Sequence, residues 1–307
     1  MRSTVHTGTD YNNTTAFSPN TGSPADEPVT IKGTGVSIVR IAGTTGNANC
    51  VRLYSGSYLF ENLEFVHKTQ SSNPLDCFFI GGGGTKLKFS GCKFKSEQSS
   101  AGASLFRDRQ NSTHIGIFSD CVFDGNNLSD FGVHRSDGTT NFAPQNFINC
   151  TFKNLANAAI RLDESRSCVI RGCVFSDCVN GVVFDANSYH QNFIEDNIFY
   201  NLSGNGIAFN NFGNLSASSY EHNIFSVITG HAFTANQDWS GAQKLSRFDR
   251  NAFHNVTGST HNNLTTGAND ITLTADPFVD AANGDFNLNA TNGGGGTLRS
   301  TNYTLGG

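Results

Sequence analysis

The chain is poor in the residues from which helical proteins are built. Of its 307 residues only 15% are charged, methionine and tryptophan occur once each, and glycine occurs 33 times. Runs of alanine, leucine, glutamate and lysine, which favour helices, are missing. No apolar run approaches the length of a membrane span, so we expect no membrane insertion. These absences argue against helical repeat folds and against an integral membrane protein.

Positive charge is also scarce. The formal net charge is −5, with 20 Lys and Arg against 25 Asp and Glu. This balance argues against a nucleic-acid partner and against binding to anionic membranes. Residues 1–20 contain no apolar core, so no signal peptide is apparent. We expect an extracellular or virion-associated protein, with the compartment itself left open.

A short motif recurs eight times along the chain: a turn residue, a small residue, one spacer and a phenylalanine. The phenylalanines are Phe65, Phe94, Phe123, Phe152, Phe175, Phe199, Phe225 and Phe253. Subtracting successive numbers gives steps of 29, 29, 29, 23, 24, 26 and 28 residues. Recurrence at this period is typical of solenoids, in which each repeat stacks on its neighbour.

Within each repeat, apolar and polar residues alternate, as at Val182 and Phe184 or Ile207 and Phe209. A period of two indicates strands, and Asn, Gly, Asp and Ser separate the strands as turns. A strand stacked on its counterpart one repeat later forms a parallel sheet with strands about 4.8 Å apart. The sequence therefore predicts an all-β fold, a single-stranded parallel β-helix with about eight or more coils, from its eight repeats.

A column of turn residues supports this register. Three positions before each phenylalanine stand, in the first six repeats, Asn62, Gly91, Asp120, Asn149, Gly172 and Asp196. These residue types tolerate left-handed backbone angles. His222 and Arg250 occupy the same position in the last two repeats and depart from this rule. We expect a looser turn or a slipped register there.

The next column changes character half-way along the chain. It reads Leu63, Cys92, Cys121, Cys150, Cys173, Asn197, Asn223 and Asn251. If the column points inward, thiols fill small apolar slots and the amides form a hydrogen-bonded ladder. Four of the eight cysteines then belong to a structural stack rather than to disulfides, and no pair of CxxC motifs suggests zinc.

The stretch VTIKGTG (29–35), followed by YSGSYLFENLEF (54–65) and the later repeats, resembles the pectate-lyase-like superfamily. This superfamily includes polysaccharide lyases and phage tailspikes, and the resemblance covers about residues 30–255. It implies a right-handed β-helix but says little about activity, because many functions share this scaffold. We expect a polar extended lead-in at 1–28, the β-helix at 29–258 and a C-terminal closing segment at 259–307. Its glycine-rich tail, Gly293–Gly296 and beyond, is expected to be flexible.

A second strand column gathers charged residues on one outward face. This face is predicted to carry Arg107, His134, Asp137, Arg161, Asp163, Glu164, Asp185 and Asn210. Carboxylates on neighbouring strands can share Ca²⁺, which takes oxygen ligands, or can act as a general acid and base. The same pattern also fits a solvated surface on which opposite charges pair.

The resemblance implies roles for these residues. In pectate-lyase-like enzymes, acidic residues hold Ca²⁺, which neutralises a uronate carboxylate, while a lysine or arginine removes the C5 proton. Transferred here, it implies Asp163, Asp185 and Asp137 as metal ligands, Arg161 as the base, His134 as the alternative base, and Arg107, Glu164 and Asn210 as substrate-binding residues. An arginine base is demanding, because guanidinium stays protonated unless its site favours the neutral form.

Trp239, the single tryptophan, is a further candidate because its ring could stack on a sugar. The first functional hypothesis is a β-helix that binds an acidic polysaccharide and, in its enzymatic version, cleaves it as a lyase, with Ca²⁺ as the only suggested cofactor. The alternative is a non-catalytic structural or adhesive module of a virion tail fibre or cell surface, which the tailspike resemblance implies could form side-by-side homotrimers. The sequence leaves substrate, catalysis and oligomeric state open.

Overall fold

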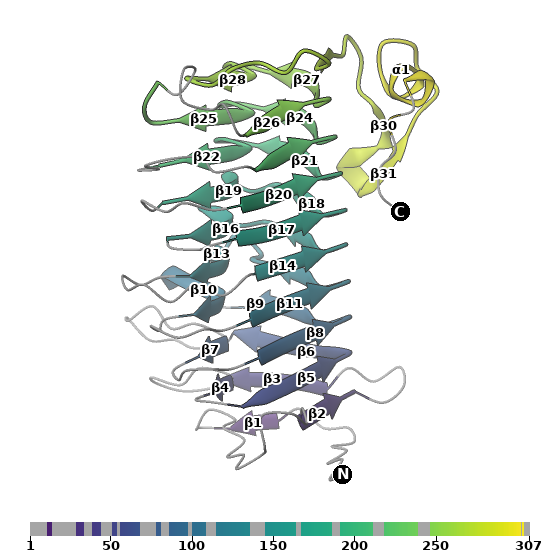
Figure 1. The fold of residues 1–307 in the computed structure, drawn as a ribbon. Coiled ribbons are helices and arrows are strands. Elements are labelled where there is room, and N and C mark those ends of the chain that lie inside the picture. Colours follow the sequence, from purple (N-terminus) through teal and green to yellow (C-terminus); the bar gives the residue numbers. More distant parts are fainter. Residues whose placement is uncertain are drawn as a thin grey trace.

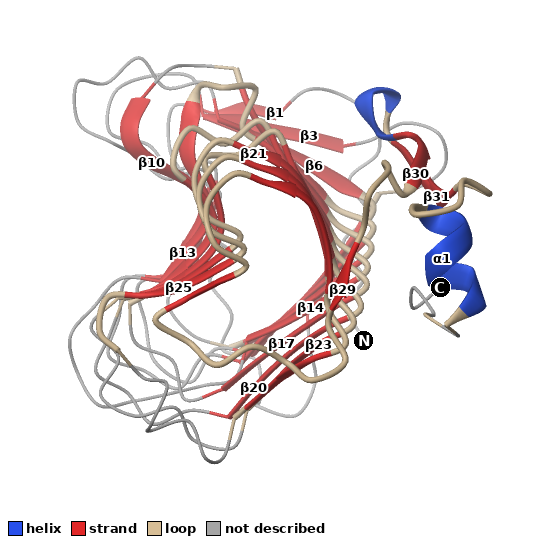
Figure 2. Cartoon of the chain, turned by 90° about the horizontal axis from the view of Figure 1, so that it is seen from above, coloured by secondary structure: helices blue, strands red, loops and turns tan. Residues whose placement is uncertain are grey.

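The computed structural model describes residues 11–13, 29–33, 39–43, 51–53, 56–67, 78–80, 86–97, 100–108, 115–135, 145–163, 167–185, 191–210, 218–238, 246–301 and 303. These residues form three parallel sheets, A, B and C, which run along one solenoid (Figure 1). Viewed along the axis, the three sheets surround a shared interior (Figure 2). The predicted all-β parallel β-helix is confirmed.

Sheet A has eleven strands and sheets B and C have nine each. Sheet A comprises β1 (Tyr11–Asn13), β3 (Val39–Gly43), β6 (Leu63–His67), β9 (Lys93–Ser96), β12 (Val122–Asp124), β15 (Thr151–Lys153), β18 (Val174–Ser176), β21 (Ile198–Leu202), β24 (Ile224–Ile228), β27 (Ala252–Val256) and β29 (Ile271–Thr272). Sheet B comprises β4 (Val51–Leu53), β7 (Phe78–Ile80), β10 (Ser100–Asp108), β13 (Ser129–Arg135), β16 (Ala158–Leu162), β19 (Asn180–Phe184), β22 (Ile207–Phe209), β25 (Phe233–Ala235) and β28 (His261–Asn262). Sheet C comprises β2 (Val29–Lys32), β5 (Ser57–Glu61), β8 (Lys86–Ser90), β11 (Ile115–Ser119), β14 (Gln145–Ile148), β17 (Ser167–Arg171), β20 (Gln191–Glu195), β23 (Ser219–Glu221) and β26 (Arg247–Asp249).

Each coil runs from sheet C to sheet A to sheet B, so neighbouring strands of a sheet come from successive coils. The last such strands, β28 and β29, lie beyond the expected boundary at residue 258. The lead-in at 1–28 lies outside the described residues except for β1, which pairs with β3.

The phenylalanine column forms the spine of the core, as predicted. All eight rings lie in register on sheet A and are at most 3% exposed. Centroids of successive rings are 4.6 to 5.6 Å apart and the rings are nearly parallel. Stacked aromatic pairs contribute about 0.5–1.5 kcal/mol each beyond the area they bury. Identical residues one coil apart therefore hold the coils in register.

The turn column keeps one backbone conformation throughout. Its first six members have φ between 53° and 64°, and His222 and Arg250 have φ of 56° and 57°. The strands β24 and β27 that follow them remain in register, with Phe225 paired to Phe253. The expected loosening is therefore wrong, because the stack imposes the left-handed turn on residues that disfavour it.

The amide half of the inward column forms the predicted ladder. Asn197 Nδ2 donates to Asn223 Oδ1 at 3.0 Å, and Asn223 Nδ2 donates to Asn251 Oδ1 at 3.1 Å. Each Nδ2 also donates to a backbone carbonyl at 2.8 or 2.9 Å. The carboxylate of Asp270 ends the ladder by accepting from Asn251 N at 2.8 Å. Buried amides are thus fully hydrogen-bonded, which removes the cost of burying them.

The thiol half behaves as expected. Within the described part of the chain, the cysteines Cys92, Cys121, Cys150, Cys168, Cys173 and Cys178 are free and buried. The neighbouring Cys150 thiol and burial raise the pKa of Cys121 to about 12. Cys50 and Cys77 lie outside the described residues. These buried thiols act as packing groups.

The C-terminal segment packs against the outer face of sheet A (Figure 1). It contains β30 (Phe278–Asp280), the 3₁₀ turn η1 (Ala281–Asn283), β31 (Asp285–Leu288) and α1 (Gly295–Ser300). Leu298 of α1 is fully buried in a cluster with Ile224 and Ala252 of sheet A. No helix in the described ranges is long and apolar enough to cross a membrane.

The glycine-rich run leads into α1, and its expected flexibility remains a prediction. Gly293 N donates to Thr297 Oγ1 at 2.8 Å, and Gly295 N donates to Asn289 Oδ1 at 3.1 Å. A Cβ atom on Gly295 would lie 2.5 Å from the backbone of Asn289. Glycine here permits close packing of the start of α1.

Candidate functional site

The outer face of sheet B carries a polar row that crosses three coils. Arg107 of β10 lies in register with His134 of β13, and His134 with Arg161 of β16. The row continues into Val183 of β19 and Ala208 of β22. Because side chains alternate along a strand, all five point to the same side of the sheet. The predicted register of His134 and Arg161 is therefore confirmed.

A second row lies where these strands end. Asp163, Asp185 and Asn210 directly follow β16, β19 and β22, whose last residues are in register. Asp185 N donates to Leu162 O at 3.0 Å and Asn210 N donates to Phe184 O at 2.7 Å. The sheet ladder thus continues one residue further and places the three side chains one coil apart, beside the first row.

Arg161 connects the two rows. Its Nε donates to Asp163 Oδ1 at 2.8 Å, and its Nη2 donates to Asp185 Oδ2. The three side chains are only 20–31% exposed. Charge-assisted hydrogen bonds of this kind are stronger than neutral ones. The guanidinium is therefore shared between the two carboxylates that the sequence suggested as metal ligands.

The titration behaviour follows from this pairing. Burial opposes ionisation of Asp163, but hydrogen bonds from His134 and Arg161 outweigh it and hold the pKa of Asp163 below its usual value. Burial likewise opposes the charge of Arg161, but Asp163 and Asp185 raise the pKa of Arg161 further. A guanidinium stabilised in this way is a hydrogen-bond donor and a poor proton acceptor.

His134 is the better placed of the two proposed bases. Its Nε2 lies 3.0 Å from Asp163 Oδ2, and in a neutral ring that donates this hydrogen bond the lone pair is on Nδ1. The ring centroid lies 4.6 Å from that of Phe131, and Arg161 Cζ lies 5.7 Å from the same Phe131 ring. His134 is only 7% exposed, and its Nδ1 is buried without a hydrogen bond in the described part of the structure. The imidazole is oriented by a carboxylate but is covered.

The described residues do not fit a Ca²⁺ site. Both oxygens of Asp163 accept hydrogen bonds from His134 and Arg161, and Asp185 accepts from Arg161. Among the residues with described positions, no group of three or more His, Cys, Asp or Glu is arranged to hold a metal. Asp137 lies outside them. A Ca²⁺ site would require Arg161 to release its carboxylates, and it remains a prediction.

The other residues proposed from the sequence as substrate-binding are Glu164, Trp239 and Arg107. Glu164 and Trp239 lie outside the described residues. Arg107 is half-buried in the polar row. Sequence reasoning missed Phe131, which packs with Ala158, Val183 and Ala208 in a buried cluster separate from the main core. The sequence signal for this cluster was that Ala158, Val183 and Ala208, at outward positions of successive sheet B strands, are small or apolar.

The fold and register define a parallel β-solenoid. The chain belongs to the right-handed β-helix family. The model of this family, described as "Right handed beta helix region", matches residues 29–225 and, in a second overlapping match, residues 78–269. Among solved structures, the crystal structure of the periplasmic alginate epimerase AlgG is similar, with 11% identity and a TM-score of 0.35 over 80% of this chain and 77% of that chain. A likeness this distant carries no functional argument. No curated protein sequence matches the chain.

Proposed function

We propose that this protein binds a polysaccharide along the outer face of sheet B. The observation that supports this is the register of the two polar rows, which repeat at the coil spacing of about 4.8 Å. This spacing is comparable to the length of one sugar unit in an extended glycan. Asp163, Asp185 and Asn210 can therefore each offer a polar group from successive coils to successive sugars.

The hydrogen-bonding groups of these rows suit sugar hydroxyls. Arg161 has five N–H donors on a partly exposed side chain, and among the described residues one of them donates to Asp163 and one to Asp185. The carboxylates can accept further hydrogen bonds from hydroxyls. Beyond Ala208, the row continues into Thr234 and Asn262, which add small polar groups. A preorganised surface of this kind lowers the ordering cost of recognition.

Binding is favoured over cleavage by the described geometry. Arg161 is held protonated by two carboxylates, and the free nitrogen of His134 is covered. The narrower proposal, an acidic-polysaccharide lyase, requires one of them to remove the C5 proton of a uronate while the C4–O bond breaks. The adhesive module of the alternative hypothesis, with its side-by-side trimer, needs only the binding face.

The proposal can be tested by screening acidic and neutral polysaccharides for binding to the full chain. Arg161→Gln and Asp185→Asn should each weaken binding about tenfold or more, as expected for charge-assisted hydrogen bonds. The matched control is Arg171→Gln, because Arg171 also contacts two carboxylates, those of Glu195 and Asp196, but on sheet C. Equal binding by all variants, or no binding to any polysaccharide, would overturn the proposal. Unsaturated uronate products that disappear with His134→Gln would instead establish the lyase version.

A further inference from the structure

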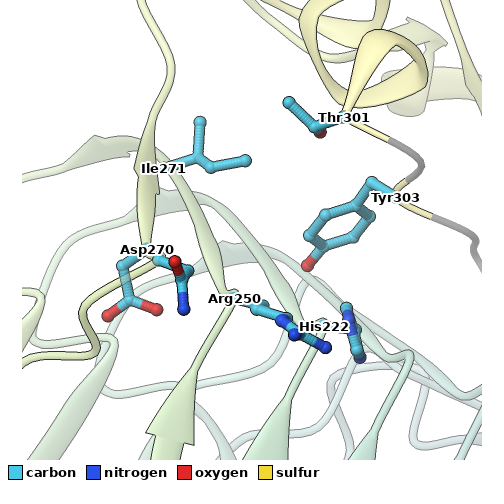
Figure 3. A pocket seen from close by; sticks show the side chains of 7 residues that line it. His222, Arg250, Asp270, Ile271, Thr301 and Tyr303 are labelled. Atoms are coloured by element: carbon cyan, nitrogen blue, oxygen red, sulfur yellow. The ribbon is translucent and has the colours of Figure 1, made fainter.

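A pocket of about 380 Å³ lies between the last turns of the β-helix and the C-terminal segment. It is lined by His222, Arg250, Asn269, Asp270, Ile271, Thr301 and Tyr303 (Figure 3). His222 and Arg250 stand in the turns between sheets C and A, so the pocket is separate from the polar rows of sheet B. Neither the sequence patterns nor the proposed function accounts for it.

Tyr303 brings an unpartnered hydroxyl into this pocket. The residue is 7% exposed, and its hydroxyl makes no hydrogen bond in the described part of the structure. The nearby N–H of Ala252 already donates to Asn223 O at 2.9 Å. Figure 3 shows the hydroxyl directed toward the side where Arg250 and His222 lie. A buried hydroxyl without a partner is costly, which suggests that a ligand supplies one.

His222 and Arg250 are in a backbone conformation that their residue types disfavour. Both have positive φ, at 56° and 57°, where the six preceding coils use Asn, Asp or Gly. Such strained positions concentrate at binding sites, where the side chain is needed more than the backbone preference. Here both side chains line the pocket. The departure from the turn rule, seen already in the sequence, thus coincides with the cavity.

Arg250 is the cationic group of the lining, and the carboxylate of Asp270 faces it with its own hydrogen bonds already made. Within the described ranges Arg250 makes no ion pair, and it is exposed. The one acidic residue of the lining, Asp270, is already engaged: its Oδ1 accepts from Asn251 N at 2.8 Å and its Oδ2 from Gly267 N at 2.9 Å. The free donors are therefore the guanidinium and the Tyr303 hydroxyl. Planar guanidinium matches a carboxylate in two hydrogen bonds.

We propose that this pocket binds a small hydroxylated carboxylate, such as a free sugar acid. The carboxylate would lie between Arg250 and the Tyr303 hydroxyl, and the carbon body would pack against Ile271. His222 lines the pocket beside Tyr303, and the two rings meet edge-on with their centroids 5.7 Å apart. Asn269 Nδ2 donates to Asp249 Oδ2 at 2.9 Å, and Asn269 Oδ1 can accept a hydrogen bond from a ligand hydroxyl.

The test is a titration of the full chain with glucuronate, acetate, glucose and phosphate, followed by calorimetry and by thermal unfolding. Glucuronate should bind and raise Tm, acetate should bind more weakly, and glucose should not bind. Arg250→Asn and Tyr303→Phe should each weaken glucuronate binding about tenfold or more. In the absence of ligand both variants should raise Tm by about 2 °C, because one relieves the turn strain and the other removes the unpaired hydroxyl.

This combined signature separates a binding role from a structural one. A purely structural arginine or tyrosine would change Tm without changing glucuronate affinity, and that result would overturn the proposal. Arg171→Gln is the control and should bind glucuronate as the wild type does. Phosphate binding as tight as that of glucuronate would overturn the carboxylate assignment, and absence of glucuronate binding would overturn the site. Neither outcome affects the polysaccharide proposal, which depends on sheet B.

Discussion

The sheet B face and the C-terminal pocket handle charge and hydrogen bonding in opposite ways. On sheet B, Arg161 contacts two carboxylates and one of these also accepts from His134. In the pocket, Arg250 has no ion pair and the Tyr303 hydroxyl no hydrogen bond within the described residues. A face whose arginine is paired with carboxylates is stable by itself and suits a long ligand, although His134 Nδ1 on this face has no hydrogen bond within the described residues. A pocket with unpaired groups is costly alone and suits a compact partner that completes it.

The largest expected effect is a loss of stability at low pH, caused by His261 in the last coil of the β-helix. The buried side chain of His261 lies with Nε2 3.5 Å from Asp270 Oδ2, and burial lowers the pKa of His261 to about 4. Because the unfolded chain binds this proton more readily, stability should fall as pH drops from about 6.5 to about 4, by about 3 kcal/mol.

Urea unfolding at a series of pH values measures this loss. His261→Gln removes the titrating group and should flatten the curve over the same window. A wild-type unfolding free energy that stays constant between these pH values would show that His261 is not buried in its neutral form.

The second effect separates the two arginines. Arg161→Gln should lower the unfolding free energy by about 2 kcal/mol, because it leaves two partly buried carboxylates without their cation. Arg250→Asn should instead raise it by about 1 kcal/mol, since asparagine tolerates the left-handed turn. Chemical denaturation of both variants gives the comparison directly. If the two substitutions change stability in the same direction, the contrast between the sites is wrong.

The reverse substitution, arginine for asparagine at an equivalent turn, tests whether turn strain costs stability. Asn149 occupies the same turn position in an earlier coil, with φ of 53°, and is exposed. Asn149→Arg should lower the unfolding free energy by about 1 kcal/mol, since it introduces the strain that Arg250 carries. Asn149→Gly serves as the control and should be close to neutral. An unaffected Asn149→Arg variant would mean that strain does not distinguish the pocket.

The smallest effect concerns Asp163. His134 and Arg161 hold the pKa of Asp163 below its usual value, so its ion pairs contribute stability above the unfolded pKa of about 3.9 and lose it as pH falls further. Asp163→Asn should remove this acid-dependent part, by about 1 kcal/mol or less for side chains that are partly exposed. Fluorescence-detected unfolding between pH 5 and pH 2 measures it. An identical acid transition in the variant would contradict the pairing.

Sequence periodicity predicted the parts of the fold that repeat. The phenylalanine and asparagine columns were predictable because a fixed period places identical residues above one another. The turn at Arg250 was not, because local backbone preference pointed away from the conformation that the stack imposes. The ion pairs of Arg161 depend on side-chain rotamers, which periodicity does not specify. The pocket depends on Tyr303, which reaches the turns only after the C-terminal segment folds back across sheet A.

The most direct test of the proposed function is the dissociation constant for a polysaccharide that binds the wild-type chain, measured alongside Arg161→Gln and Arg171→Gln. Binding on sheet B predicts a loss of about tenfold or more for Arg161→Gln and an unchanged constant for Arg171→Gln. Equal constants for all three proteins, or the absence of any polysaccharide that binds, would contradict it.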